Sequence, residues 1–325
     1  MANGILVVGE VDGGALVPLT AEMLGAARRL EAGTVTCVLM GAGVEAGAKD
    51  AAAFGADEVL IVDDPAMAEY NTDTYLQAML KVIEQASPAI ALFGQSNLGR
   101  DLAPRVAFRL NTGVIMDCVE LAMDGDRMQG TRPCYGGNAR AVNVVRGDPQ
   151  IATVRAKSQD PIERDDSREA PVTKVDPAID MAAVRVKVTN RQGMTAEGIR
   201  LEDADVVVSG GRGLGGPENF DVIESLAGAL GAAVGASRAV CDLGWRPVSD
   251  QVGLTGKVVS PTLYIAVAIS GASQHMAGCS GSKNIVAVNK DADANIFKAS
   301  RFGIVEDYAK VIGPLTEAIK KEKGT

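Results

Sequence analysis

Short apolar runs alternate with amphipathic segments through the first half of the chain. The runs have the length and β-branched content of buried strands, which predicts strands at Ile5–Val8, Val35–Met40, Val59–Val62 and Ala89–Phe93. The segments between and after them follow the helical period, which predicts helices at Leu19–Leu30, Val44–Phe54, Thr72–Gln85 and Ser96–Leu110. Asn97 is the expected cap of the last helix. Such alternation requires crossover connections, so we expect a Rossmann-like α/β domain with a mostly parallel sheet.

The pattern changes after this region. Short stretches separated by turn residues predict antiparallel hairpins that complete the first domain, at Cys118–Leu121, Arg127–Thr131, Ala139–Val145 and Ile151–Arg155. Ser158–Asp176 is rich in charges and prolines without an apolar period, which is typical of a solvated connector. Val184–Val188 predicts one more strand. We place the domain boundary after residue 190, giving domains of residues 1–190 and 191–325.

The α/β pattern then starts again. Strands are expected at Val206–Val208, Ala233–Gly235, Tyr264–Ile269, Ile285–Val288 and Phe302–Val305. Helices are expected at Pro217–Leu230, with Pro217 in its first turn, and at Tyr308–Lys323, which ends in basic residues. The second domain is therefore predicted to be a doubly wound parallel sheet.

Composition excludes several classes of function. Apolar residues make up 47% of the chain, enough for two buried cores, and the net charge of −9 argues against nucleic acid as a partner. The five cysteines form no CxxC pair and there is a single histidine, so we expect no metal site. No apolar run approaches the ~18 residues of a membrane span. Strand residues begin at Ile5 without a leader, and the scattered thiols suit a reducing compartment, so the expected location is cytoplasmic.

A glycine motif and an arginine are the first candidates for chemistry. Gly211, Gly213 and Gly216 form G-x-G-x-x-G after a strand, where either dinucleotide phosphates or an ordinary flexible turn would need them. A nicotinamide site would carry an acid at the end of the next strand. Here Ser237 and Arg238 stand there instead, which disfavours NAD and favours a nearby anion.

Three later segments carry polar side chains after strands. Residues 251–257 place polar groups between glycines, a pattern that suits either a ligand or a surface loop. Residues 270–275 bring small and hydroxyl residues with His275 to the end of an apolar strand, where open α/β sheets bind ligands. Asn289 and Asp307 fit helix caps from spacing alone. With no nucleophile–base pair in the sequence pattern, these residues indicate a site that holds a cofactor.

The same residues resemble a known family. Residues 263–266, 269–271, 274–275, 278 and 287–289 are similar to the signature of electron-transfer flavoprotein alpha subunits, and residues 208–213, 235–238 and 251–257 match that family in the same order. The resemblance is dense over residues 205–312 and looser in the first half. It implies FAD on the second domain, facing a smaller beta subunit that the first domain also contacts.

The resemblance also implies roles for individual residues. Arg238 would lie against the isoalloxazine ring and favour its anionic reduced forms, Thr255 would bond near the flavin N5 edge, and His275 would lie near the pyrimidine carbonyl. Ribityl or diphosphate contacts would come from Arg212, Ser237, Ser270 and Gln274, and adenosine contacts from Asn289 and Asp307. The other expected cofactor-binding residues are Gln251, Val252, Gly253, Leu254, Gly271, Ala272, Ser273 and Tyr308. Leu254 departs from the glutamine common in mitochondrial-type relatives, so a contact there must come from backbone.

Three hypotheses follow from this sequence. The family resemblance implies a flavin electron carrier rather than a stand-alone enzyme. It would accept electrons from acyl-CoA dehydrogenases or other flavin dehydrogenases and pass them to a quinone reductase or ferredoxin. An NAD(P)-dependent enzyme lacks its ribose-binding acid, and a scaffold without cofactor would not need the polar set around Arg238, Thr255 and His275. Within the first hypothesis, an electron-bifurcating form would oxidise NADH with a second FAD in the beta subunit.

Overall fold

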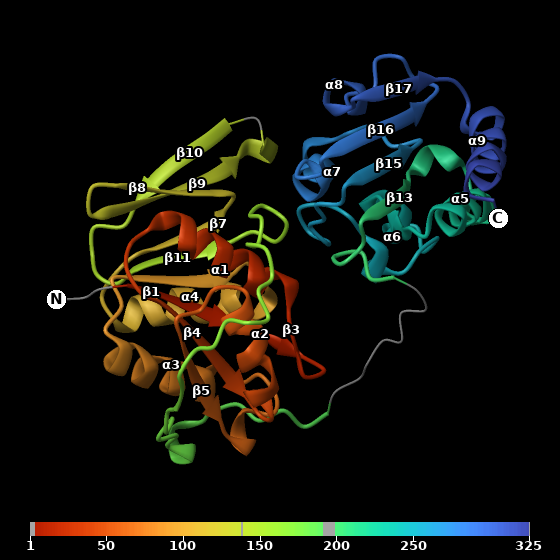
Figure 1. The fold of residues 1–325 in the computed structure, drawn as a ribbon. Coiled ribbons are helices and arrows are strands. Elements are labelled where there is room, and N and C mark those ends of the chain that lie inside the picture. Colours follow the sequence, from red (N-terminus) through yellow and green to blue (C-terminus); the bar gives the residue numbers. More distant parts are fainter. Residues whose placement is uncertain (1–3, 138, 191–198, 325) are drawn as a thin grey trace. The chain divides into compact units, whose positions relative to one another are not determined.

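The chain divides into two compact units in the computed structural model, which describes residues 4–137, 139–190 and 199–324 (Figure 1). The N-terminal unit comprises Met1–Pro133 and Arg140–Gln192, and the C-terminal unit comprises Cys134–Ala139 and Gly193–Thr325. The boundary predicted after residue 190 adjoins residues 191–198, which lie outside the described part of the chain.

The N-terminal unit is built on a seven-stranded sheet in the order β12-β5-β4-β1-β6-β11-β7, and the strand pairs described in it are parallel. The strands are β1 Ile5–Gly9, β4 Val35–Gly41, β5 Glu58–Asp63, β6 Ile90–Gly94, β7 Val114–Cys118, β11 Gln150–Val154 and β12 Val172–Lys174. The neighbours β5-β4-β1-β6 have the 3-2-1-4 order of a Rossmann half, which confirms the predicted fold class for this unit.

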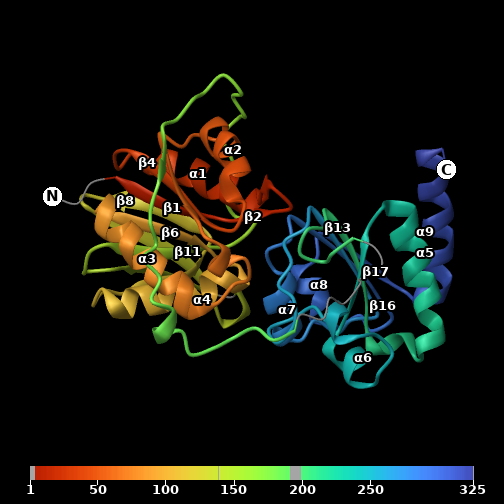
Figure 2. The same ribbon diagram turned by 90° about the horizontal axis from the view of Figure 1, so that it is seen from below.

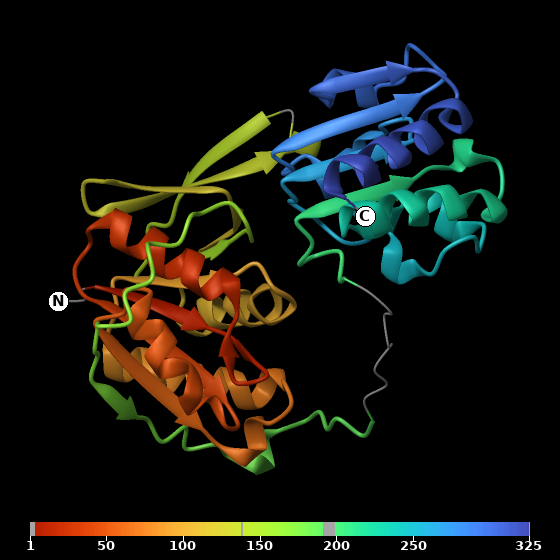
Figure 3. The same cartoon turned by 45° about the vertical axis from the view of Figure 1, so that its right-hand side comes forward.

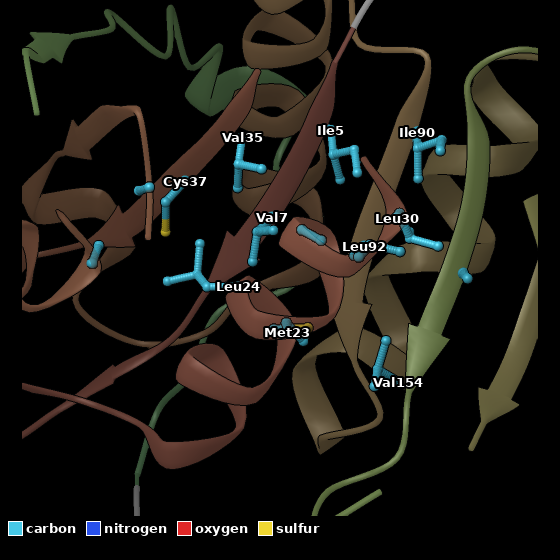
Figure 4. Close-up of a cluster of buried hydrophobic side chains, with 14 of the residues drawn as sticks. Ile5, Val7, Met23, Leu24, Leu30, Val35, Cys37, Ile90, Leu92 and Val154 are labelled. Atoms are coloured by element: carbon cyan, nitrogen blue, oxygen red, sulfur yellow. The ribbon is translucent and has the colours of Figure 1, made fainter. Parts of the chain in front are cut away.

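Helices cover both faces of this sheet. They are α1 Pro18–Leu30, α2 Gly47–Ala53, α3 Thr72–Ala86 and α4 Asn97–Arg109, with single 3-10 turns at η1 Val44–Ala46 and η2 Pro65–Met67. Successive β1 residues point to opposite faces, so Ile5 and Val7 pack with α1 and α2 (Figure 4), while Leu6 and Val8 pack with α3 and α4. Aliphatic residues therefore fill two cores, one on each side.

The region predicted as hairpins has a different structure. Residues 118–121 do not form one strand: β7 ends at Cys118 in the main sheet, and β8 Glu120–Asp124 begins a small sheet with β9 Arg127–Cys134 and β10 Ala139–Val144. The prediction for residues 151–155 was wrong, because β11 lies parallel between β6 and β7. All five β11 residues are buried, as a strand covered on both faces requires.

Other local predictions are also corrected. The connector at 158–176 contains β12, which pairs with β5. Residues 184–188 form no strand: the Val186 carbonyl accepts from the Asn71 amide and Arg185 N donates to Asp73, so side chains of the α3 start hold this segment. Ser96, not Asn97, caps α4, since its hydroxyl accepts from Gly99 N at 3.0 Å. A short hairpin, β2 Val11–Asp12 with β3 Ala15–Leu16, was not predicted.

The C-terminal unit is a five-stranded sheet in the order β14-β13-β15-β16-β17, with every described pair parallel (Figure 3). The strands are β13 Val206–Gly210, β14 Ala233–Ala236, β15 Leu263–Val267, β16 Asn284–Asn289 and β17 Phe302–Val305. The helices are α5 Asp221–Leu230, α6 Arg238–Asp242, α7 Ser273–Cys279, α8 Ile296–Ala299 and α9 Tyr308–Lys323.

Two hydrophobic clusters show that this sheet is doubly wound, as predicted. One face packs against residues of α7 and α8, including Cys279 and Ile296. The other packs against α5, α6 and α9, and α5 and α9 lie side by side on it (Figure 2). The helix predicted from Pro217 starts as a 3-10 turn, η6 Pro217–Phe220, before α5.

In the parts of the chain that the structure covers, helices are either too short or too polar to cross a bilayer.

A buried glutamate in the N-terminal unit yields a stability prediction. Glu22, on α1, is 8% exposed and accepts the Lys157 N–H at 2.6 Å. Burial raises the pKa of Glu22 to about 7, against the lowering effects of that hydrogen bond and of the Lys157 charge. The folded state therefore keeps a proton that the unfolded chain releases near pH 4.5. The contribution of Glu22 to the free energy of unfolding accordingly falls as the pH rises from 4.5 through 7.

Glu22→Gln should raise the free energy of unfolding at pH 8 by on the order of 1–3 kcal/mol, because the neutral amide carries no ionisation penalty. The gain should shrink towards pH 4.5. Denaturant unfolding across this range measures it, with Glu163→Gln, at an exposed position, as control. A gain that does not vary with pH would contradict this explanation.

Candidate functional site

The carboxyl ends of the C-terminal strands lie in register along one edge of the sheet. Gly210 at the end of β13 pairs with Ala236 of β14 and with Val267 of β15, and Val267 pairs with Val288 of β16. The strand order reverses between β13 and β15, and ligands of open α/β sheets bind outside the carboxyl ends at such a switch point. Of the residues predicted from sequence, positions 212, 237–238, 270–275 and 307–308 follow strand ends, and Asn289 is the last residue of β16. Residues 251–255 follow a 3-10 turn, and Gln251 forms a bridge with Ala236 at the end of β14.

Backbone hydrogen bonds connect the segments at the switch point. Gly211 N donates to the Val267 carbonyl at 2.9 Å, and Ser237 N donates to the Gly210 carbonyl at 3.0 Å. A Cβ on Gly211 would lie 2.1 Å from the Ala268 carbonyl oxygen, so only glycine lets the two strand ends approach this closely. Ala268 itself has φ of 55°, which turns the chain sharply out of β15. The edge is therefore held by main-chain contacts.

The glycine motif does not open directly into a long helix. Gly211 leads into η5 Arg212–Leu214, then η6, and α5 begins only at Asp221. The positive φ in this turn belongs to Gly215, outside the G-x-G-x-x-G positions. The arrangement differs from the strand–turn–helix geometry in which a dinucleotide phosphate meets a helix N-terminus.

Residues 251–257 form a loop that lies on the first turn of α7. Val252 N donates to the Ala236 carbonyl at 2.9 Å, and Leu254 N donates to the Gln274 carbonyl at 2.7 Å. A Cβ on Gly278 would come within 2.3 Å of Gly253 N, so the loop and the helix meet backbone to backbone. This loop, called the cofactor loop below, is thereby attached to both β14 and α7.

His275 is buried beneath the cofactor loop. It is 6% exposed, and its Nε2 lies 2.9 Å from the hydroxyl of Tyr264 on β15. Burial lowers the pKa of His275 to about 4, and the nearby Val252 carbonyl opposes that shift. Nδ1 is buried and completes no hydrogen bond with any described group. The chain's one imidazole is therefore neutral at physiological pH.

Two arginines expose positive charge at this edge. Arg238 begins α6, and its guanidinium lies 3.3 Å from Asp242 in an exposed ion pair. Arg212 is exposed and makes no ion pair or side-chain hydrogen bond with residues that the structure describes. Exposed ion pairs contribute little energy, so both guanidinium groups are free to rearrange towards an anion.

The remaining predicted residues offer hydroxyl, amide and backbone groups. The Gln251 amide donates to Thr255 Oγ1 at 3.0 Å, and Gln251 is 5% exposed whereas Thr255 is exposed. Ser273 donates to the Gln274 side chain at 3.3 Å. Leu254, Ser270 and Ala272 are exposed, and Gly271 is buried.

The last two strands place their residues in structural hydrogen bonds. The Asn289 amide donates to the Ile269 carbonyl at 2.9 Å, and its oxygen accepts from Asp291 N, so it supports a turn rather than a helix cap. Asp307 caps α9 by accepting from Ala309 N. The Tyr308 hydroxyl donates to the Leu214 carbonyl at 2.8 Å, which ties α9 to the turn after β13.

Sequence reasoning missed two residues here. Tyr264 is fully buried beside His275, and Ser209, on β13, has a buried hydroxyl that completes no hydrogen bond among described groups. The available signal was a tyrosine inside an otherwise aliphatic strand, because a buried tyrosine hydroxyl usually has a polar partner. The thiol of Cys279 is also nearby, but burial raises its pKa to about 12, so it is not a thiolate nucleophile.

Known proteins similar to this chain agree with the geometry. Residues 5–180 match the family described as "Electron transfer flavoprotein domain", and residues 200–280 match "Electron transfer flavoprotein FAD-binding domain". "Electron transfer flavoprotein subunit alpha" from Thermoanaerobacterium thermosaccharolyticum is 45% identical over 325 residues, covering 98% of each chain. The protein of that name from Bacillus subtilis is 42% identical, covering 99% of this chain and 98% of its own. "Protein FixB" from Clostridium saccharobutylicum is 38% identical, covering 98% and 97%.

One match spans more than half of the chain and the relatives align over nearly all of it, so the chain belongs to the electron transfer flavoprotein alpha subunit family.

Proposed function

We propose that this chain binds FAD at the carboxyl edge of its C-terminal sheet and acts, with a beta subunit, as an electron carrier. The observation that supports this most is the parallel register of the five strands, because residues 212, 237–238, 270–275 and 307–308 come after strand ends at one edge of this sheet. The match of residues 200–280 to an FAD-binding domain covers the ends of β13, β14 and β15.

The chemistry of this edge fits FAD. The cofactor has an anionic diphosphate, a hydroxylated ribityl chain and a flavin ring that becomes anionic on reduction. Arg212 and Arg238 supply exposed positive charge in a chain whose net charge is −9. Ser237, Ser270 and Ser273 supply hydroxyl groups that bond sugar-like hydroxyls. No group of three or more metal-ligating side chains occurs among the described residues, and organic cofactor chemistry needs none.

When bound, the flavin supplies one- and two-electron transfer, and the protein supplies binding, orientation and electrostatics. Arg238 would face the ring and stabilise negative charge on it. Thr255, on the exposed side of the cofactor loop, would bond the N5 edge, and Gln251 holds its hydroxyl in place. Asn289, Asp307 and Tyr308 follow the last strands and would serve the adenosine end.

The remaining cofactor contacts in the proposal come from the loop and from α7. Leu254 offers only its backbone, because its side chain is apolar and 66% exposed. Residues 252–253 and 270–274 would surround the ribityl chain and the diphosphate, with Arg212 nearest to the phosphates. His275 would lie near the pyrimidine carbonyl and the ribityl chain.

The partners proposed for this chain follow from its family. The beta subunit would cover the flavin and also contact the N-terminal unit. Electrons would enter from acyl-CoA dehydrogenases or other flavin dehydrogenases and leave to a quinone reductase or a ferredoxin. The alternative is an electron-bifurcating complex in which the beta subunit holds a second FAD and oxidises NADH, and counting FAD per heterodimer distinguishes the two.

Co-expression with the beta subunit should yield a yellow complex, whereas the chain alone should bind FAD weakly, because part of the site is expected from the partner. Visible absorbance, with quantification of the released nucleotide, gives FAD per heterodimer. One FAD supports the simple carrier and two support the bifurcating form. A colourless complex that takes up no added FAD would refute the proposed function.

Arg238→Ala should lower the first reduction potential of the bound flavin, because a guanidinium near the ring stabilises its reduced anionic form. One charged contact at a partly exposed site is worth roughly 1–3 kcal/mol, equivalent to about 40–130 mV for one electron. Arg238→Lys should retain part of the effect, since it keeps the charge but loses the planar fork.

A reductive titration followed by visible absorbance measures this potential. Arg200→Ala is the matched control, because Arg200 also forms an exposed ion pair, with Asp203 at 3.4 Å, but precedes β13 at the opposite edge of the sheet. An unchanged potential in Arg238→Ala would assign Arg238 to phosphate binding or to the subunit interface.

A further inference from the structure

A buried polar cluster joins β13, β15 and α7 under the cofactor loop. The Tyr264 hydroxyl lies 2.9 Å from His275 Nε2, and both side chains are more than nine-tenths buried. Among the described residues Ser209 Oγ completes no hydrogen bond, yet it lies near Tyr264, where it opposes the larger rise that burial causes in the pKa of that phenol. The cluster thus holds more polar atoms than it satisfies, beside apolar residues such as Val207 and Ala266 that pack with Tyr264.

We propose that Tyr264 is a positioning residue whose hydroxyl donates to His275 Nε2 and holds the neutral imidazole in the tautomer protonated on Nδ1. A neutral imidazole carries one proton, and the group bonded to one nitrogen decides which nitrogen carries it. Ser209 can then donate to the Tyr264 oxygen, since a phenol oxygen accepts while its proton is donated elsewhere.

The other tautomer leaves two polar groups badly placed. If Nε2 carried the proton and donated to Tyr264, the phenol proton would have to turn to Ser209 Oγ, which completes no hydrogen bond among the described residues, or to the Cys279 sulfur, a weak acceptor. The bare Nδ1 lone pair would then face the Val252 carbonyl, which lies close enough to the ring to act on its pKa. Two acceptors would repel each other there, whereas Nδ1–H and a carbonyl attract.

The consequence is a hydrogen-bond donor directed at the cofactor loop. Among the described residues Nδ1 completes no hydrogen bond, although the Val252 carbonyl lies near the ring, so its proton is available to an acceptor that arrives with a ligand or when the loop adjusts around one. This role rests on the proposed function, because the cofactor is the expected source of that acceptor. The fixed tautomer would favour ligand groups that accept a hydrogen bond, such as ring carbonyls. It would disfavour N–H groups of a ligand, because two donors would then face each other.

The tautomer is testable because the chain has one histidine. The full-length chain labelled with 15N-histidine should give one dominant neutral tautomer, protonated on Nδ1. Tyr264→Phe removes the donor and should yield a mixture of the two tautomers. Tyr75→Phe is the matched control: Tyr75 is 6% exposed, and its hydroxyl donates to the Met67 carbonyl in the N-terminal unit. Its spectrum should equal that of the wild type.

A wild-type spectrum with the proton on Nε2 overturns the proposal, and it does so whether or not Tyr264→Phe folds. An unchanged Nδ1–H spectrum in a folded Tyr264→Phe chain also overturns it.

The complex with the beta subunit tests the link to the cofactor. Tyr264→Phe should weaken FAD binding by about two- to tenfold, the effect of one neutral hydrogen bond, while Tyr75→Phe should not. If the wild-type complex binds no FAD, the proposed function fails and the tautomer result stands alone. If the wild type binds FAD and Tyr264→Phe binds it equally well, the proposed role of the tyrosine towards the cofactor is wrong.

Discussion

Parallel strand register is the constraint on which the candidate site depends. Because the five C-terminal strands run the same way and end together, side chains far apart in sequence come to one edge of the sheet. Main-chain hydrogen bonds from Gly211 and Ser237 then close the edge around the switch point. The strand topology thus determines where the candidate site lies, and the individual side chains determine its chemistry.

At this edge the charged side chains are exposed, and neutral polar side chains are buried. Arg212 and Arg238 keep their charges in solvent, where rearrangement towards an anion costs little. Below them, His275 and Tyr264 are buried as neutral groups, since burial moves the pKa of each away from its charged form. Under the proposed function, a cofactor at this edge would meet exposed cations and fixed neutral dipoles, which suits a ring whose charge changes during electron transfer.

The sequence predicted the strands and the last helix well because their apolar periods are strong. It failed where the same apolar run fits two structures: residues 151–155 look like a hairpin strand, and only the sheet shows that β11 is covered on both faces. Residues 184–188 have strand composition but no neighbouring strand, so side chains of α3 bind them instead. That polar residues would follow the ends of β13, β14, β15 and β17 was predictable from the sequence, and their roles towards a cofactor stay predictions. The contact of Tyr264 with His275 was not, because it depends on how α7 packs on β15.

Amide hydrogen exchange of the complex, with and without FAD, tests most directly whether the cofactor lies at this edge. FAD should slow exchange in residues 210–215, 236–239, 251–257 and 269–275, the segments that follow β13, β14 and β15 and the cofactor loop. Slowing confined to the N-terminal unit, for example at residues 10–14 and 95–99 after β1 and β6, would contradict the account.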